Sequence, residues 1–163
     1  MTPDPKVLEL LRRSVAAHWE AVEAYTGQRA HLKAAGYSDR LADAAGADPD
    51  DERVHLARLL DRLEFFDEPT DSDEPTDSDE PREPTEWPRH DLAGLLAYNL
   101  ALEEGAAEIE REGCKAALAA GDFGSFHVFR ENLAGSEDGI LTLRATQRKV
   151  ADQSIQNFLS AFN

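Results

Sequence analysis

The stretch DEPTDSDEPTDSDEPREPTEWP, residues 67–88, divides this chain of 163 residues into two helical halves. It repeats the hexapeptide DEPTDS and is rich in acidic residues and proline. Proline interrupts helices, and a polar tract of this kind cannot bury a hydrophobic core. We therefore predict that residues 67–88 form an extended, solvated and flexible crossover between the two halves.

The half before the crossover is predicted to be helical, with one interruption. Apolar residues recur every three or four positions over residues 5–35, which is typical of a long amphipathic helix. A short helix is expected over residues 37–45. Asp48 then provides an N-cap and Pro49 a first helical position for a helix that ends near Phe66.

The half after the crossover predicts two more long helices, over residues 91–120 and 126–150, joined by a turn at 121–125. Residues 154–162 predict a short final helix, and no stretch alternates as a strand would. The sequence thus indicates an all-α single domain over residues 1–163, a four-helix bundle with a long crossover and a short C-terminal fifth helix. The crossover makes the second and third long helices parallel.

The composition limits the partners and the compartment. Lys and Arg number 17 against 33 Asp and Glu, a formal net charge of −16, which disfavours binding to nucleic acid or to an anionic membrane surface. The acidity fits attraction of cations, and it equally fits solubility or a high-salt habitat. A single cysteine, Cys114, excludes a disulfide framework and favours the cytoplasm. The DEPTDS repeat lacks the glycine and final glutamate of an EF-hand calcium loop.

Ionisable residues interrupt the apolar stripes of all four long helices. His18, Glu52, His55, Glu103 and Glu137 each lie three, four or seven positions from apolar residues, so we expect them to point inward. A buried carboxylate must be neutralised, be paired or bind a metal. Carboxylate and imidazole ligands suit iron or manganese. The pattern therefore predicts a metal site inside the bundle.

Simpler explanations exist for each residue taken alone. A Glu-x-x-His pair arises by chance, and His18 could be a core histidine that is satisfied by a hydrogen bond. Glu103 and Glu137 each precede a second acidic residue, so a shift of one position would expose them. Tyr25 lies seven positions after His18 on the same stripe, where it either borders the site or packs in the core.

Several motifs of the chain resemble those of bacterioferritin, a family of the ferritin-like superfamily, over nearly the whole length. The motifs are Lys33–Gly36 at the end of the first helix, Glu52–Arg58 as Glu-x-x-His-Ala-x-Arg, Leu100–Glu103 as Leu-Ala-Leu-Glu, Ser136–Gly139 as the acidic fourth-helix motif and Ile155–Leu159 as Leu-Gln-Asn-Tyr-Leu. The resemblance implies a 24-subunit hollow cage. It also implies a di-iron ferroxidase centre in each bundle, which oxidises Fe(II) before storage.

The resemblance assigns ligands by position. One iron site would take His18, Glu52, His55 and Glu137, and the other would take Glu52, Glu103 and Glu137. Glu52 and Glu137 would bridge the two ions.

The chain departs from the family at three positions. His18 stands where the family has glutamate, Ile140 where it has a second histidine, and Arg53 where a methionine ligates haem, so haem is not expected. The reduced ligand set favours a single ion of iron, zinc or manganese and a weakened ferroxidase. The predicted function is iron oxidation or storage. The alternatives are a non-catalytic structural subunit, which could co-assemble with an active bacterioferritin, and an oxidase of a small organic substrate.

Overall fold

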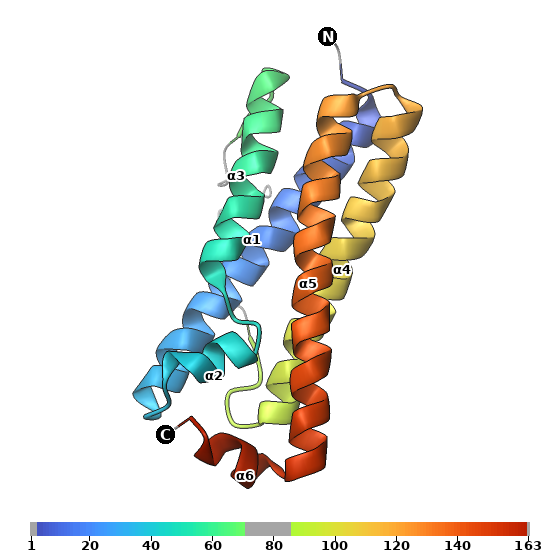
Figure 1. The fold of residues 1–163 in the computed structure, drawn as a ribbon. Coiled ribbons are helices and arrows are strands. Elements are labelled where there is room, and N and C mark those ends of the chain that lie inside the picture. Colours follow the sequence, from blue (N-terminus) through green and yellow to red (C-terminus); the bar gives the residue numbers. More distant parts are fainter. Residues whose placement is uncertain (1–2, 71–85, 163) are drawn as a thin grey trace.

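The computed structural model describes residues 3–70 and 86–162, and every regular element in these ranges is an α-helix (Figure 1). The helices are α1 (Pro5–Ala34), α2 (Asp39–Ala44), α3 (Pro49–Phe65), α4 (Leu92–Ala119), α5 (Phe123–Gln153) and α6 (Ile155–Ser160). The predicted all-α class, with four long helices and a short C-terminal helix, is confirmed. No helix in the described residues is long and apolar enough to span a membrane.

The four long helices lie side by side along one bundle axis (Figure 1). α4 and α5 form a tight antiparallel pair, while α1 contacts both α3 and α4. α3 ends at the opposite end of the bundle from the start of α4, so the two helices run parallel. α2 and α6 close one end, where Ser38 donates a backbone hydrogen bond of 2.9 Å to the Phe162 carbonyl.

Aspartate side chains mark the starts of the long helices. Asp4 accepts hydrogen bonds from two backbone N–H groups of α1, and Asp48 does the same for α3 ahead of Pro49. Asp122 caps α5 by accepting from the Ser125 N–H at 2.9 Å. This cap explains why α5 begins at Phe123, three positions earlier than the pattern predicts.

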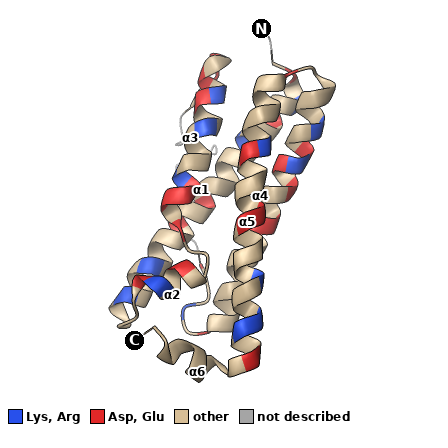
Figure 2. Ribbon diagram, viewed as in Figure 1, with Lys and Arg blue, Asp and Glu red and all other residues tan. Residues whose placement is uncertain are grey.

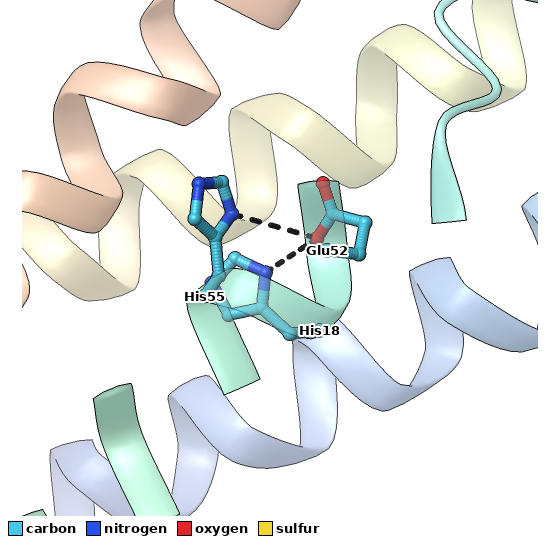
Figure 3. A group of neighbouring side chains, drawn as sticks. All are labelled: His18, Glu52 and His55. Atoms are coloured by element: carbon cyan, nitrogen blue, oxygen red, sulfur yellow. Dashed lines mark hydrogen bonds and ion pairs between the residues drawn. The ribbon is translucent and has the colours of Figure 1, made fainter. Parts of the chain in front are cut away.

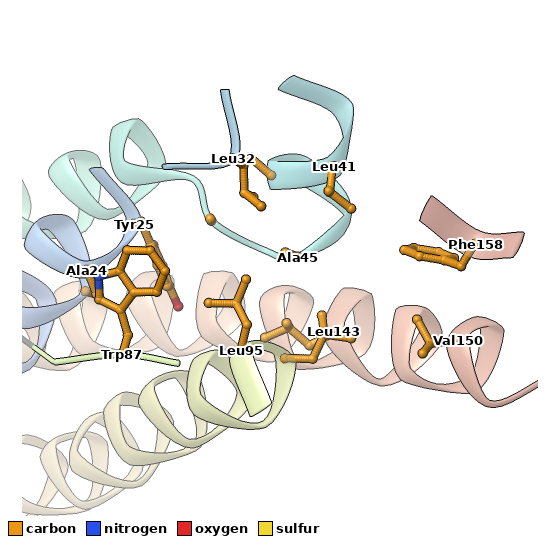
Figure 4. Close-up of a cluster of buried hydrophobic side chains, with 14 residues drawn as sticks. Ala24, Tyr25, Leu32, Leu41, Ala45, Trp87, Leu95, Leu143, Val150 and Phe158 are labelled. Carbon is orange, nitrogen blue, oxygen red and sulfur yellow. The ribbon is translucent and has the colours of Figure 1, made fainter. Parts of the chain in front are cut away.

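Two apolar clusters fill the bundle, one toward the end where the C-terminus lies and one toward the end where the N-terminus lies (Figure 1). The C-terminal cluster contains buried residues such as Tyr25, Leu95, Leu143 and Phe158 (Figure 4). The N-terminal cluster contains Val7, Leu10, Leu11, Leu59, Leu63, Phe66, Ala117 and Phe129. Between the two clusters in sequence, α1, α4 and α5 carry buried polar side chains, namely those of His18, Glu103, Glu110 and Ser136. A buried polar layer therefore separates the two apolar clusters.

The crossover prediction is corrected at one residue. Trp87, assigned to the tract without a core, is only 8% exposed and belongs to the C-terminal cluster. Its indole Nε1 would lie 3.4 Å from a Cβ added at Gly27, so the ring packs closely against α1. Residues 71–85, which carry most of the DEPTDS repeat, lie outside the described residues, and the extended crossover there stays a prediction.

Candidate metal centre

Three side chains from two helices meet in the buried polar layer (Figure 3). His18 comes from α1, and Glu52 and His55 come from α3, where a spacing of three residues places them on one face. His18 Nδ1 lies 2.6 Å from Glu52 Oε2, and His55 Nδ1 lies 3.8 Å from the same oxygen. All three are buried, and one donor atom from each lies within 4.8 Å of the other two.

A second carboxylate reaches His18 from α4, and the sequence did not lead us to expect it. Glu110 is fully buried, and its Oε1 lies 2.6 Å from His18 Nε2. Ser136 on α5 donates a hydrogen bond of 3.3 Å to Glu110 Oε2. The imidazole of His18 therefore lies between two carboxylates, one at each ring nitrogen.

Glu103 and Tyr25 form a neighbouring buried pair. The Tyr25 hydroxyl donates a hydrogen bond of 2.7 Å to Glu103 Oε1, and Glu103 is 6% exposed. Burial and the nearby charge of Glu52 raise the pKa of Glu103 to about 8, although the Tyr25 hydrogen bond opposes the shift. Burial, together with the Glu103 carboxyl, also raises the pKa of Tyr25. The Glu103 carboxyl can thus hold a proton near neutral pH in the metal-free protein.

Hydrogen bonding outweighs burial at His18 and Glu52. Burial disfavours the charged imidazole, but the hydrogen bonds to Glu110 and Glu52 raise the pKa of His18 to about 9. Burial likewise disfavours the charged carboxylate, yet the His18 hydrogen bond and the nearby His55 ring lower the pKa of Glu52 to about 2. Without metal, these two residues therefore form a buried ion pair at pH 7.

Glu137 does not join this group, and the prediction that it points inward is wrong. Its side chain is 54% exposed and lies 3.4 Å from Arg111 on the outer surface. The inward position on α5 belongs to Ser136, which is fully buried. The prediction depended on the apolar residues Leu133 and Leu141, but Leu141 is 63% exposed, so the stripe that they define faces outward.

The side of α5 that faces the site carries almost no side-chain donor. A Cβ added at Gly135 would overlap the His55 ring, and one added at Gly139 would lie 3.0 Å from Glu103 Cδ. With Ser136 between them, these positions bring the α5 backbone close to the centre. The residues on the side of α5 that faces the site are therefore Gly135, Ser136 and Gly139, and Glu137 is not among them.

The residues present fit one metal ion. His55 Nδ1 is buried and lacks a hydrogen-bond partner in the described part of the chain, and such an atom is costly unless something binds it. Two imidazoles and a carboxylate suit iron, manganese or zinc. His18, Glu52 and His55 can therefore hold a metal ion. A second ion would need further donors, and the described residues of α5 bring no buried carboxylate or imidazole to the site.

A cavity of about 230 Å³ lies beside the centre and reaches the surface. Buried Glu52 and Glu103 line its inner part. Its other lining residues are Asp43, Gly46, Asp48, Asp51, Gly135, Asp138, Gly139 and Thr142. Figure 2 shows acidic residues at the start of α3 and in the middle of α5. A cavity lined by carboxylates raises the local concentration of cations.

Comparison with known proteins places the chain in a family. No curated protein sequence matches it. A sequence profile of the ferritin-like domain, however, matches residues 8–152, which include all four long helices nearly in full. The match agrees with the observed bundle and with the parallel arrangement of α3 and α4. The chain therefore belongs to the ferritin-like domain family.

Proposed function

We propose that the protein is a bacterioferritin-like subunit that binds one iron ion per bundle and takes part in iron oxidation or storage. The observation that carries this proposal is the buried Nδ1 of His55, which lacks a hydrogen-bond partner in the described residues and lies 3.8 Å from the Glu52 carboxylate. His18, from a different helix, brings a third donor to the same point. Three donors aimed at one place inside a ferritin-like bundle support a metal centre.

Each residue would have a distinct part in handling Fe(II) as substrate. The acidic cavity would attract the cation, and His18, Glu52 and His55 would hold it. Iron supplies one-electron redox chemistry when it is bound. The carboxyl of Glu103 can keep or release a proton beside the centre, and the hydroxyl of Tyr25 fixes its orientation. O₂ or peroxide would accept the electron, and because one Fe(II) ion supplies one electron while reduction of either oxidant to a stable product takes at least two, we expect ferroxidase activity to be weak.

The same donor set would accept other ions. Two imidazoles and one carboxylate are also a common zinc set, and manganese would suit the carboxylates as well. Haem is not part of the proposal, because Arg53 stands at the position of the methionine ligand and pairs with Asp50 on the surface.

The proposal extends to assembly and location. Ferritin-like proteins typically oligomerise, and the Ile155–Leu159 motif, which lies within α6, supports a 24-subunit cage of this chain. Co-assembly with an active bacterioferritin is a further part of the proposal, as is a cytoplasmic location. The acidity of the chain supports neither nucleic acid nor an anionic membrane as a partner.

A non-catalytic structural subunit is the second candidate, and one observation favours it. The His18 imidazolium lies 2.6 Å from Glu52 and 2.6 Å from Glu110, so a protonated ring offsets buried negative charge without any metal. A bundle of this kind is able to fold and assemble with the centre free of iron.

Metal binding and particle size separate the two candidates. Purified protein would be equilibrated anaerobically with Fe(II), and its iron content and its mass by light scattering would be measured together. Cage-sized particles with one tightly bound iron per chain would support the iron-binding subunit. Cage-sized particles that retain no iron would support the structural subunit. The Glu137→Gln variant should bind as much iron as the unmodified protein, since that carboxylate lies on the surface.

A further inference from the structure

Glu110 is a fully buried carboxylate on α4. In the described part of the chain, its hydrogen bonds join it to His18 and to Ser136. It lies seven residues, about two helical turns, after Glu103 on the same face of α4. No lysine or arginine contributes to these hydrogen bonds, so the fold keeps an acidic group in the core in order to meet the His18 ring.

The two nitrogens of His18 face different groups. Nδ1 points to Glu52 and shares the three-donor group with His55, whereas Nε2 points to Glu110. A histidine binds a metal through the lone pair of one nitrogen, so the proton of the neutral ring must lie on the other nitrogen. A carboxylate that accepts this second proton fixes the tautomer and orients the ring.

We propose that Glu110 is a positioning residue, which accepts the Nε2 proton of His18 and so leaves Nδ1 free to bind the metal. Ser136 supports it by donating to the other carboxylate oxygen of Glu110, which holds the carboxylate in place. α5 thus contributes the Ser136 hydroxyl, which orients the Glu110 carboxylate and does not itself bind the metal. The inference rests on the proposed metal site at His18, Glu52 and His55.

The arrangement makes Glu110 a residue that acts through His18. Glu110 Oε1 is already 2.6 Å from Nε2, the ring nitrogen that does not face Glu52. A carboxylate in this position adds negative charge beside the ring, which makes the Nδ1 lone pair a stronger donor. Replacing Glu110 by glutamine keeps the shape and removes the charge, so it isolates this effect.

The test compares Glu110→Gln with Glu108→Gln, whose side chain is 61% exposed on the same helix. Zn(II) affinity and stoichiometry would be measured by calorimetry, and the protonated nitrogen of His18 would be identified by ¹⁵N NMR in the Zn-loaded protein. We expect Glu110→Gln to weaken Zn(II) binding by about 10- to 100-fold with one ion still bound, and the Nε2 proton of His18 to lose its single position. Ser136→Ala should move both readouts in the same direction by a smaller factor, and Glu108→Gln should move neither.

Three other outcomes would count against the inference in different ways. Unchanged Zn(II) affinity and an unchanged Nε2 proton in Glu110→Gln would overturn the positioning role while leaving the metal site intact. Loss of all Zn(II) binding in a folded Glu110→Gln variant would make Glu110 a direct ligand and overturn the positioning role. Failure of the unmodified protein to bind Zn(II) or Fe(II) would overturn the proposed function itself. Circular dichroism melting would confirm that each variant is folded.

Discussion

α4 and α5 pack against each other along most of their length, yet they present opposite chemistry to the centre of the bundle. α4 contributes the buried carboxyls of Glu103 and Glu110, whereas α5 contributes Gly135, Ser136 and Gly139. The absent side chains on α5 make room for the His55 ring and for the Glu103 carboxyl. A site whose donors come from one side has fewer ligands, and this asymmetry is why we assign one ion rather than two.

Glu52→Ala, on α3, should weaken the metal centre most strongly. It removes the one carboxylate shared by His18 and His55 and leaves a buried imidazolium with a single partner. We expect Zn(II) affinity to fall at least 100-fold and the free energy of unfolding to fall by about 3 kcal/mol, as when one member of a buried ion pair is removed. Calorimetry and urea unfolding would measure the two effects. Exposed Asp51→Ala is the matched control, and an equal loss in both variants would contradict the assignment.

The pH dependence of stability should reveal the positive charge that His18 holds in the metal-free protein. The pKa of His18 is raised to about 9 in the folded protein from 6.5, so its contribution is fully present below pH 6.5 and is lost as the pH rises through 9. We expect the metal-free protein to lose about 2–3 kcal/mol of unfolding free energy between pH 6.5 and 9 from His18. Glu103, with its pKa raised to about 8, binds an extra proton when folded and changes stability in the same direction.

Urea unfolding at a series of pH values would measure this dependence. His18→Gln should remove the part of the slope that comes from His18 and leave the part that comes from Glu103. A metal-free protein whose stability is constant or rises over that range would show that His18 does not hold a proton between Glu52 and Glu110.

Gly135→Ala should disturb the metal centre from the α5 side. The added Cβ would overlap the His55 ring, so the ring or the α5 backbone must move. We expect a loss of about 1–3 kcal/mol in unfolding free energy and weaker Zn(II) binding. Gly105→Ala on α4 is the control, because nothing lies within 4 Å of its added Cβ. It should stabilise the protein by up to about 1 kcal/mol. Equal behaviour of the two variants would mean that α5 does not approach the site.

Adding metal-binding side chains to α5 should make its inner face resemble that of α4. Ser136→Glu combined with Gly139→His places a carboxylate and an imidazole where α5 faces the centre, and the flexible end of Glu103 can yield to the new side chain. We expect bound Fe(II) to rise from one to two ions per chain and initial Fe(II) oxidation to become faster in a stopped-flow assay. The pair Glu137→His and Ile140→His, on the outward side, should change neither. No gain in the first variant would show that the α5 side does not limit the site.

Local sequence patterns that have one physical meaning predict the structure of this chain correctly. Asp–Pro caps and apolar periodicity located the long helices, and His18, Glu52, His55 and Glu103 lie in the buried layer as expected. Inside a helix, one position of register rotates a side chain by about 100°, so apolar residues on an outward stripe can mislead. Exposed Leu141 is such a residue, and it drew the prediction to Glu137.

Glu110 was missed for the same reason of register. Its neighbour Ile109 is the apolar residue of the pair, yet Ile109 is only half-buried and Glu110 is fully buried. The seven-residue spacing from Glu103 was the available signal, because residues two turns apart share a face. The burial of Trp87 could not be predicted from the local sequence, because its packing against Gly27 depends on a contact between distant parts of the chain.

Counting the ions directly tests the central claim of one metal per bundle. Crystals grown from the metal-free protein would be soaked anaerobically in Fe(II), and anomalous scattering would be recorded at the iron edge. We predict a single anomalous peak in each bundle, within bonding distance of His18 Nδ1, Glu52 and His55. Two peaks in a bundle, or a peak at Glu137 with none among these three residues, would contradict it.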